Sequence, residues 1–138
     1  MLGIKTRLIV FSLFMLQSVY AAEMVEVDVQ GLEKLMASGV TVIDVRTPSE
    51  WKKTGIVEGS IPIMFFDGMG QPHVQVWMQQ SSEYITPDKQ VAIICRTGKR
   101  SKVVGDFLIK QHGYESVYNV TGGIKAWIAQ GNNTVEAK

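Results

Sequence analysis

Residues 91–101 read VAIICRTGKRS and place the only cysteine of the chain, Cys95, between an apolar run and a basic loop. The run before Cys95 is apolar and partly β-branched, which predicts a buried strand that ends at the cysteine. From Ser101 onward, the apolar residues over 103–108 recur at helical spacing, which predicts a helix. The stretch therefore predicts a strand, a tight loop and a helix in succession.

The loop surrounds its cysteine with positive charge. Arg96, Lys99 and Arg100 follow Cys95 closely, and the start of the helix adds backbone N–H groups and the positive end of the helix dipole. Under these conditions a thiol becomes a thiolate near neutral pH. We therefore expect a sulfur nucleophile that handles an anionic substrate. The alternative is a structural cysteine, buried as free cysteines commonly are.

Strand-like and helix-like patterns alternate along the chain. The alternation predicts one α/β domain, with a mainly parallel sheet of about five strands and helices on both faces. Ligands of such sheets bind beyond the carboxyl ends of the strands, where Cys95 is expected. The predicted strands are 24–27, 40–45, 60–65, 91–95 and 116–120, and the predicted helices are 29–38, 48–55, 74–82, the segment from 101, and 124–129.

Two of these helices begin with capping signals. Asp28 is an expected N-cap for the first helix. Thr47 is the expected cap of the second, Pro48 takes its first position, and Glu50 completes a capping box.

The first residues of the chain predict export. Lys5 and Arg7 precede an apolar core at 8–19, and Ala21 offers a small residue at a cleavage site. The core is shorter than the ~20 residues of a membrane span, which favours cleavage. An uncleaved membrane anchor is the alternative. We expect residues 1–21 to be a cleaved signal peptide, 22–130 the domain and 131–138 a flexible tail. The expected location is periplasmic or secreted.

The composition excludes some classes of partner. The 14 Lys and Arg residues and 13 Asp and Glu residues give a net charge of +1, and loss of Lys5 and Arg7 with the signal peptide leaves it close to neutral. Such a domain lacks the basic surface of a protein that binds nucleic acid or an anionic membrane. We therefore expect neither as a partner after cleavage.

Four segments resemble motifs of the rhodanese-like sulfurtransferase family, in its single-domain exported form. The loop 95–101 matches C-R-x-G-x-R-S, and 121–127 matches the closing G-G-x-x-x-W. Residues 42–51 are similar to D-V-R-x-P-x-E-[FWY], and residues 59–63 to G-[AS]-x-x-I. The four segments follow the order of the family.

The resemblance implies covalent catalysis in two steps, with Cys95 as the nucleophile. The cysteine takes the outer sulfur of thiosulfate as a persulfide and passes it to a thiophilic acceptor, such as cyanide, a thiol or an acceptor protein. No metal and no organic cofactor is implied. The residues expected to bind the substrate are Arg96, Thr97, Gly98, Lys99, Arg100 and Ser101.

These loop residues have different expected roles. Arg96 and Lys99 are expected to project and attract the anionic donor, and Arg100 to turn back onto carbonyls of the loop. Gly98 is expected to adopt a backbone conformation that other residues resist. The two hydroxyl residues, Thr97 and Ser101, are expected either to donate to the persulfide or to cap the helix.

Two rival functions remain. In the related cysteine phosphatases five residues separate the cysteine from the arginine, whereas four separate Cys95 from Arg100. By resemblance, the shorter loop encloses a sulfur atom rather than a phosphate, so a phosphatase or arsenate reductase is the weaker alternative. A persulfide carrier that acts only with a partner protein is the other.

Some residues outside the loop also have expected roles. The family's His-x-Pro-Gly is absent from 55–59, and 64–82 is longer than a minimal member needs, which leaves the acceptor open. Asp44 and Arg46 are expected to hold the fold through an ion pair or hydrogen bonds rather than to do acid–base chemistry. His73 and His112 are expected on the surface, so no Cys–His dyad is predicted.

Overall fold

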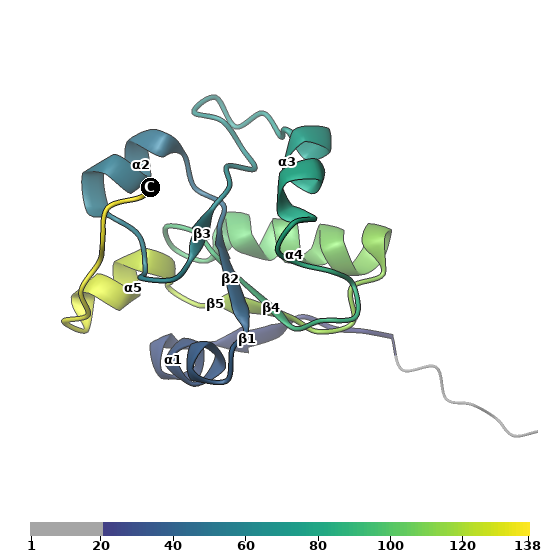
Figure 1. Cartoon of the computed structure of the whole chain (residues 1–138), viewed down its shortest axis with the longest axis horizontal. Helices are drawn as coiled ribbons and strands as arrows, with labels where there is room; N and C mark the ends of the chain where they lie inside the picture. Colours follow the sequence, from purple (N-terminus) through teal and green to yellow (C-terminus); the bar gives the residue numbers. More distant parts are fainter. Residues whose placement is uncertain (1–20) are drawn as a thin grey trace, which may run out of the picture.

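The structure is a computed structural model that describes residues 21–138. The predicted signal peptide, residues 1–21, lies outside the described residues except for Ala21. Within 21–138, no helix has the length and apolar character needed to cross a membrane. The elements (Figure 1) are β1 (Val25–Val27), α1 (Val29–Ala37), β2 (Thr41–Asp44), α2 (Pro48–Thr54), β3 (Ile61–Pro62), α3 (Val74–Ser81), β4 (Val91–Ile94), α4 (Lys99–His112), β5 (Val117–Val120) and α5 (Gly123–Ala129).

The five strands of residues 21–138 form one parallel sheet in the order β1-β5-β4-β2-β3. In the central strand β4, Ile93 pairs with Ile43 of β2 and with Asn119 of β5. Because all the strands run the same way, their carboxyl ends lie at one edge of the sheet, and Cys95 follows β4 at that edge. The predicted α/β class and five-stranded parallel sheet are confirmed.

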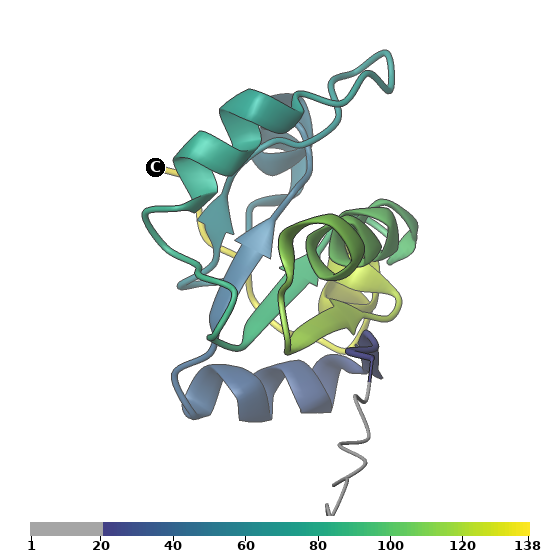
Figure 2. The ribbon, with the colours of Figure 1, turned by 90° about the vertical axis from the view of Figure 1, so that its right-hand side faces the viewer.

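Helices cover both faces of the sheet. Trp77 of α3 and Leu108 of α4 belong to the core on one face, and Leu32 of α1 and Ile124 of α5 belong to the core on the other. Figure 2 shows α1 below the sheet, with α3 and α4 on its other side. The residues of β4 alternate between the two cores and are all fully buried, which explains why this strand is apolar throughout.

The capping signals are confirmed. The Thr47 hydroxyl accepts from the Glu50 N–H at 3.4 Å, and the Glu50 carboxylate accepts from the Thr47 N–H at 3.1 Å. The Asp28 carboxylate accepts from the N–H of Gly31 at 2.8 Å. α4 begins at Lys99, two residues before the position that apolar spacing predicted.

β3 is shorter than predicted, because it comprises Ile61–Pro62 rather than residues 60–65. Among the strands of the part of the chain that the structure describes, it is an edge strand with β2 as its neighbour. Beyond it, the carbonyl of Ile63 accepts a hydrogen bond from the indole of Trp77 at 3.0 Å, and Phe65 enters the core beside Trp77. The apolar run is therefore long because α3 covers it, not because it is all strand.

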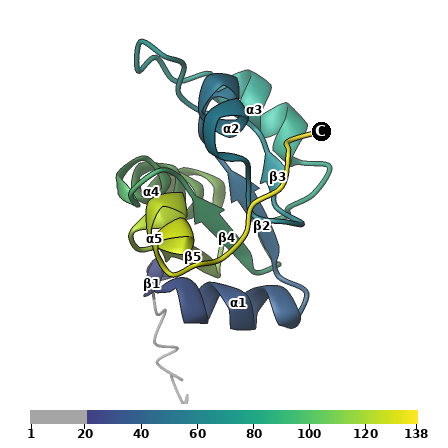
Figure 3. The same ribbon diagram turned by 90° about the vertical axis from the view of Figure 1, so that its left-hand side faces the viewer.

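The C-terminal residues 131–138 have contacts that their polar sequence did not predict. Val135 and Ile56 exchange two backbone hydrogen bonds, at 2.8 and 2.9 Å. The Thr134 hydroxyl donates to the carbonyl of Thr54 at 2.7 Å. Figure 3 shows this segment, in yellow, running from α5 across the molecule toward β3. The segment predicted to be flexible therefore lies along the domain.

Candidate active site

Cys95 lies at the carboxyl end of β4 and is 1% exposed. Two donors reach its sulfur: the backbone N–H of Gly98 at 3.1 Å and the hydroxyl of Ser101 at 3.2 Å. Both donors come from the start of α4, so the positive end of the helix dipole faces the sulfur. Burial alone fits a structural cysteine, but polar donors aimed at the sulfur favour an anion there.

Gly98 allows the loop to turn tightly enough for its own N–H to reach the sulfur. Its φ is 95°, in the left-handed region that glycine adopts without strain. A Cβ at this position would lie 3.1 Å from the carbonyl oxygen of Val120. The backbone conformation predicted for Gly98 is confirmed.

The start of α5 fixes the other side of the loop. The N–H of Ile124 donates to the carbonyl of Cys95 at 2.9 Å, and that of Lys125 to the carbonyl of Arg96 at 3.1 Å. Gly123 has a φ of 57°, and a Cβ on it would collide with the same two carbonyls. The Gly-Gly motif therefore serves the close approach of α5 to the loop.

The structure corrects the role predicted for Arg100. Its guanidinium donates to the carboxylate of Glu50 in α2, at 2.8 and 2.6 Å, and not to carbonyls of its own loop. A carboxylate offers this planar group two charge-assisted hydrogen bonds at once. The hydrogen bonds from Arg100 lower the pKa of Glu50 from 4.5 to about 2. In return, hydrogen bonding to Glu50 raises the pKa of Arg100.

Asp44 and Arg46 form a buried ion pair at the end of β2, with Nη2 and Oδ2 2.7 Å apart. Arg46 also donates to the carbonyl of Gly55 after α2, at 2.9 Å, and the indole of Trp51 donates to Asp44 at 3.1 Å. The pair therefore positions α2, which carries Glu50. The structural role predicted for Asp44 and Arg46 is confirmed.

A buried residue that sequence reasoning missed contacts the site from β5. Asn119 is 2% exposed, and its Nδ2 donates to the carbonyl of Gly98 at 3.1 Å and to the Glu26 carboxylate at 2.8 Å. Both partners only accept, so its Oδ1 faces the Ser101 hydroxyl, 2.5 Å away. That hydroxyl has one hydrogen and two acceptors in reach, Asn119 Oδ1 and Cys95 Sγ. The sequence signal for Asn119 is a polar residue inside an apolar strand.

Arg96, Thr97 and Lys99 are exposed. Within residues 21–138, neither cation forms an ion pair, so both are available to an anion that arrives from solvent. Of the two hydroxyl residues, Ser101 contacts the sulfur. Neither side chain caps α4, whose N-cap is Gly98.

The two histidines lie on the surface, as predicted. His73 is exposed and pairs with Asp67 at 2.9 Å, and His112 is exposed near the end of α4. Across residues 21–138, His, Cys, Asp and Glu side chains do not gather in threes that could hold a metal ion.

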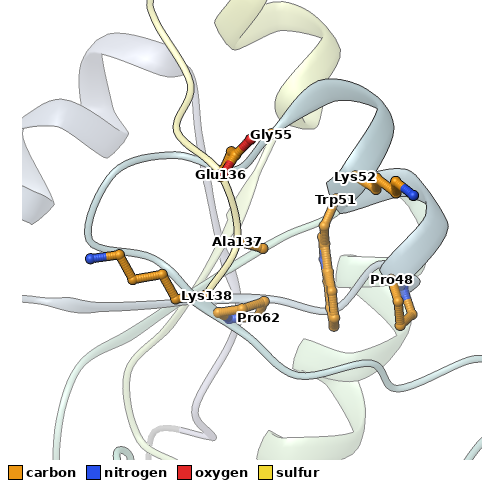
Figure 4. A pocket seen from close by; sticks show the side chains of 8 residues that line it. All are labelled: Pro48, Trp51, Lys52, Gly55, Pro62, Glu136, Ala137 and Lys138. Atoms are coloured by element: carbon orange, nitrogen blue, oxygen red, sulfur yellow. The ribbon is translucent and has the colours of Figure 1, made fainter.

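Two cavities lie against α2. One, of about 420 Å³, lies between α2 and α5 and reaches the loop at Arg96. The other, of about 490 Å³, lies between α2, β3 and the C-terminal segment, where Figure 4 shows Trp51, Lys52 and Pro62 around it. Of these two cavities, the one between α2 and α5 has a residue of the loop, Arg96, in its lining.

Known proteins share this fold and this length. The chain matches the family model of the rhodanese-like domain over residues 28–130. It is 34% identical over 115 residues to thiosulfate sulfurtransferase 18 of Arabidopsis thaliana. This match covers 80% of this chain and 83% of that protein. It is 35% identical over 108 residues to a sulfurtransferase of Allochromatium vinosum, with 77% and 90% covered.

Solved structures of rhodanese-related proteins have a similar fold. The chain is similar to the crystal structure of a rhodanese-related protein from Thermoplasma volcanium, with a TM-score of 0.60 and 29% identity over 80% of this chain and 97% of that one. The family model spans most of the described residues, and the relatives are matched over most of their own length. The chain therefore belongs to the family of rhodanese-like domains.

Proposed function

We propose that the protein is a sulfurtransferase that moves a sulfane sulfur from thiosulfate, or a similar donor, to a thiophilic acceptor through a persulfide on Cys95. The observation that carries this proposal is the sulfur of Cys95 at a strand end, with donors from Gly98 and Ser101 at 3.1 and 3.2 Å. Membership of the family, and relatives named as sulfurtransferases, support sulfur transfer as the reaction.

In the first half-reaction, the Cys95 thiolate attacks the outer sulfur of thiosulfate. A bond forms between the two sulfur atoms, the S–S bond of the donor breaks, and sulfite leaves with the electron pair. Arg96 and Lys99, both exposed, attract the doubly charged donor to the loop. The new terminal sulfur carries the negative charge, which the backbone N–H groups at the start of α4 stabilise.

In the second half-reaction, the acceptor attacks that terminal sulfur. With cyanide the product is thiocyanate, and the electron pair of the broken S–S bond returns to the Cys95 sulfur. The thiolate is thereby regenerated, and neither an oxidant nor a reductant is consumed. The enzyme alternates between a free and a persulfide form, which is the basis of ping-pong kinetics.

Thiocyanate formation from thiosulfate and cyanide tests the proposal. We expect ping-pong kinetics for the wild-type protein and no turnover for Cys95→Ser, because an alcohol cannot hold the sulfane sulfur. Thermal melting of the two proteins is the control, since the smaller oxygen atom should leave the fold intact. Thiocyanate formation by the serine variant at the wild-type rate would overturn the proposal.

The burial of Cys95, at 1% exposed, favours a second candidate. In this candidate the persulfide is loaded and unloaded only by a partner protein that reaches the buried sulfur, so the domain is a carrier. Acceptor kinetics separate the two functions. A carrier would show negligible turnover with cyanide and small thiols but would bind its partner, whereas an enzyme turns over with small acceptors alone.

We also propose that residues 1–21 direct export and are removed after Ala21. The support for this is the sequence, with its cations at 5 and 7 and its apolar core at 8–19. The protein would then act in the periplasm or outside the cell.

A further inference from the structure

Glu50 neutralises one of the three cations of the loop. Its carboxylate accepts hydrogen bonds from both terminal nitrogens of Arg100, at 2.8 and 2.6 Å. The other two cations, Arg96 and Lys99, are exposed, and neither forms an ion pair within residues 21–138. An anion that arrives at the loop therefore meets two free cations and a third that a carboxylate already holds.

The carboxylate of Glu50 is fixed from behind, independently of Arg100. Its Oε2 accepts from the N–H and from the hydroxyl of Thr47, both at 3.1 Å. The helix that carries it, α2, is joined to the buried Asp44–Arg46 pair by the hydrogen bonds described above. Arg100 therefore turns toward a carboxylate that the fold holds in place, and this sets the direction of its guanidinium.

Arg100 is near enough to the nucleophile to serve an anion there. It directly precedes Ser101, whose hydroxyl lies 3.2 Å from the Cys95 sulfur. Hydrogen bonding to Glu50 is the main cause that raises the pKa of Arg100, and negative charge on Cys95 raises it further. The Arg100 side chain is 30% exposed, so solvent ions reach it. Its two parallel donors match the oxygens of a tetrahedral anion as well as those of a carboxylate.

We propose that Glu50 is a positioning residue that determines specificity: it withholds Arg100 from oxyanions and so keeps sulfate-like and phosphate-like ions from binding tightly at the loop. This inference rests on the proposed function, in which the donor and the sulfite that leaves are both oxyanions. Arg96 and Lys99 attract the donor weakly enough for sulfite to depart. A third free cation would retain sulfite and would let other oxyanions compete with the donor.

Sulfate is the probe, because it is thiosulfate with oxygen in place of the outer sulfur and so cannot donate sulfur. Its affinity for the Cys95→Ser protein is measured by NMR titration of the backbone amides of residues 96–101, at constant ionic strength. Glu50→Gln removes the charge and keeps the shape. It should tighten sulfate binding about tenfold, the effect of one charge-assisted hydrogen bond. Equal dissociation constants with and without Glu50→Gln would overturn the inference.

Glu136→Gln is the matched control. Glu136 is exposed, forms no ion pair within residues 21–138, and lines the cavity between α2, β3 and the C-terminal segment (Figure 4). The substitution removes the same charge as Glu50→Gln, so it should leave the affinity for sulfate unchanged. An equal gain in the two variants would reduce the effect to net charge and overturn the inference.

A double substitution tests whether Arg100 carries the effect. In an Arg100→Gln background there is no guanidinium to release, so Glu50→Gln should no longer change the affinity for sulfate. Arg100→Met, which keeps an apolar stem, takes the place of Arg100→Gln if that variant does not melt cooperatively. A tenfold gain that persists without Arg100 would overturn the inference.

Turnover extends the test to the protein with its cysteine. With thiosulfate and cyanide as substrates, sulfate should compete with thiosulfate, and its inhibition constant should be about tenfold lower for Glu50→Gln than for the wild-type protein. A merely structural role of Glu50 would lower the rate without changing this constant. Similar constants in two active proteins would leave the sulfurtransferase intact and overturn this inference. Tighter sulfate binding by Glu50→Gln in a protein without turnover would support the role of Glu50 and defeat the proposed function.

Discussion

The hydroxyl of Ser101 has a single hydrogen, and two acceptors compete for it. When Cys95 is a thiol, it can donate to the Ser101 oxygen, and the hydroxyl then donates to Asn119 Oδ1, 2.5 Å away. When Cys95 is a thiolate, the sulfur needs that hydrogen, and Asn119 Oδ1 loses its buried partner, which is costly. Asn119 therefore competes with the Cys95 sulfur for the single hydrogen of the Ser101 hydroxyl.

Asn119→Leu tests this competition, because leucine has a similar size and no acceptor. The Ser101 hydrogen is then free to serve the Cys95 thiolate at all times. We expect iodoacetamide to alkylate Cys95 of the variant about tenfold faster than Cys95 of the wild-type protein at the same pH, the effect of one hydrogen bond to a charged group. The measurement is the second-order rate constant of alkylation of the two proteins under identical conditions.

The control is the same substitution in a Ser101→Ala background, where there is no hydroxyl to release and no change in the alkylation rate is expected. An equal change in both backgrounds would contradict the competition. It would mean that the substitution acts through charged groups near the site, which are Glu26 behind Asn119, Arg100 with Glu50, and the Asp44–Arg46 pair.

The exposed cations of the loop lead to a second prediction. Replacing both Arg96 and Lys99 with alanine should raise the KM for thiosulfate by about tenfold and change kcat less, since each exposed charge contributes up to about 1 kcal/mol of binding. The wild-type KM should rise with salt, and the double variant should lose most of that dependence. A wild-type KM and salt profile in the double variant would show that neither cation contacts the donor.

Among single residues, the sequence predicts those parts of the site that lie next to one another in the chain. Cys95, Gly98 and the loop cations lie within one short segment, so their spacing predicts the site. Asn119 and Glu26 are 93 positions apart and meet because β1 pairs with β5. No local pattern contains that pairing.

Among the elements, α2 and α4 are joined by the ion pair between Glu50 and Arg100. Glu50→Gln removes the charge but keeps the shape, so α2 should still form. We expect the free energy of unfolding at neutral pH to fall by on the order of 1 kcal/mol, as for a bidentate, partly exposed pair. Urea unfolding of both proteins measures this loss.

The ion pair between Glu50 and Arg100 also makes the free energy of unfolding depend on pH. Hydrogen bonds from Arg100 lower the pKa of Glu50 from 4.5 to about 2. The contribution of the carboxylate is therefore complete above pH 4.5 and is lost as the pH falls toward about 2. The Glu50→Gln variant should lack this part of the acid destabilisation. Parallel pH profiles for the two proteins would contradict the assignment.

Sequence patterns predict the elements well where the signal is local. The capping box at Thr47 and Glu50 involves residues three apart, so it could be identified without the fold. The partner of Glu50 could not, because Arg100 is 50 positions away. The length of β3 was overestimated because burial under α3 produces the same apolar pattern as a strand. The sequence does not predict the contacts of residues 131–138, because Val135 pairs with Ile56 through the backbone and the Thr134 hydroxyl donates to a backbone carbonyl.

For the whole molecule, the alternation of strands and helices was enough to predict the parallel sheet, since two-sided burial makes β4 apolar at every position. The two cavities against α2 could not be predicted from the sequence, because their walls come from α2, α5, β3 and the C-terminal segment. These walls depend on how the helices pack.

Export is a prediction for the whole molecule. Native protein from an extracytoplasmic fraction should begin at Ala22 or Glu23, because the apolar core ends shortly before Ala21. N-terminal sequencing measures this directly. Protein that begins at Met1 in a cytosolic fraction would contradict the prediction.

The central claim is that Cys95 holds a sulfane sulfur, and intact-mass spectrometry tests it most directly. After incubation with thiosulfate, the protein should gain the mass of one sulfur atom, and cyanide should remove that mass with release of an equal amount of thiocyanate. Because Cys95 is the only cysteine of the chain, Cys95→Ser should gain nothing. A wild-type protein that gains no mass and releases no thiocyanate, or a serine variant that gains the same mass, would contradict the account.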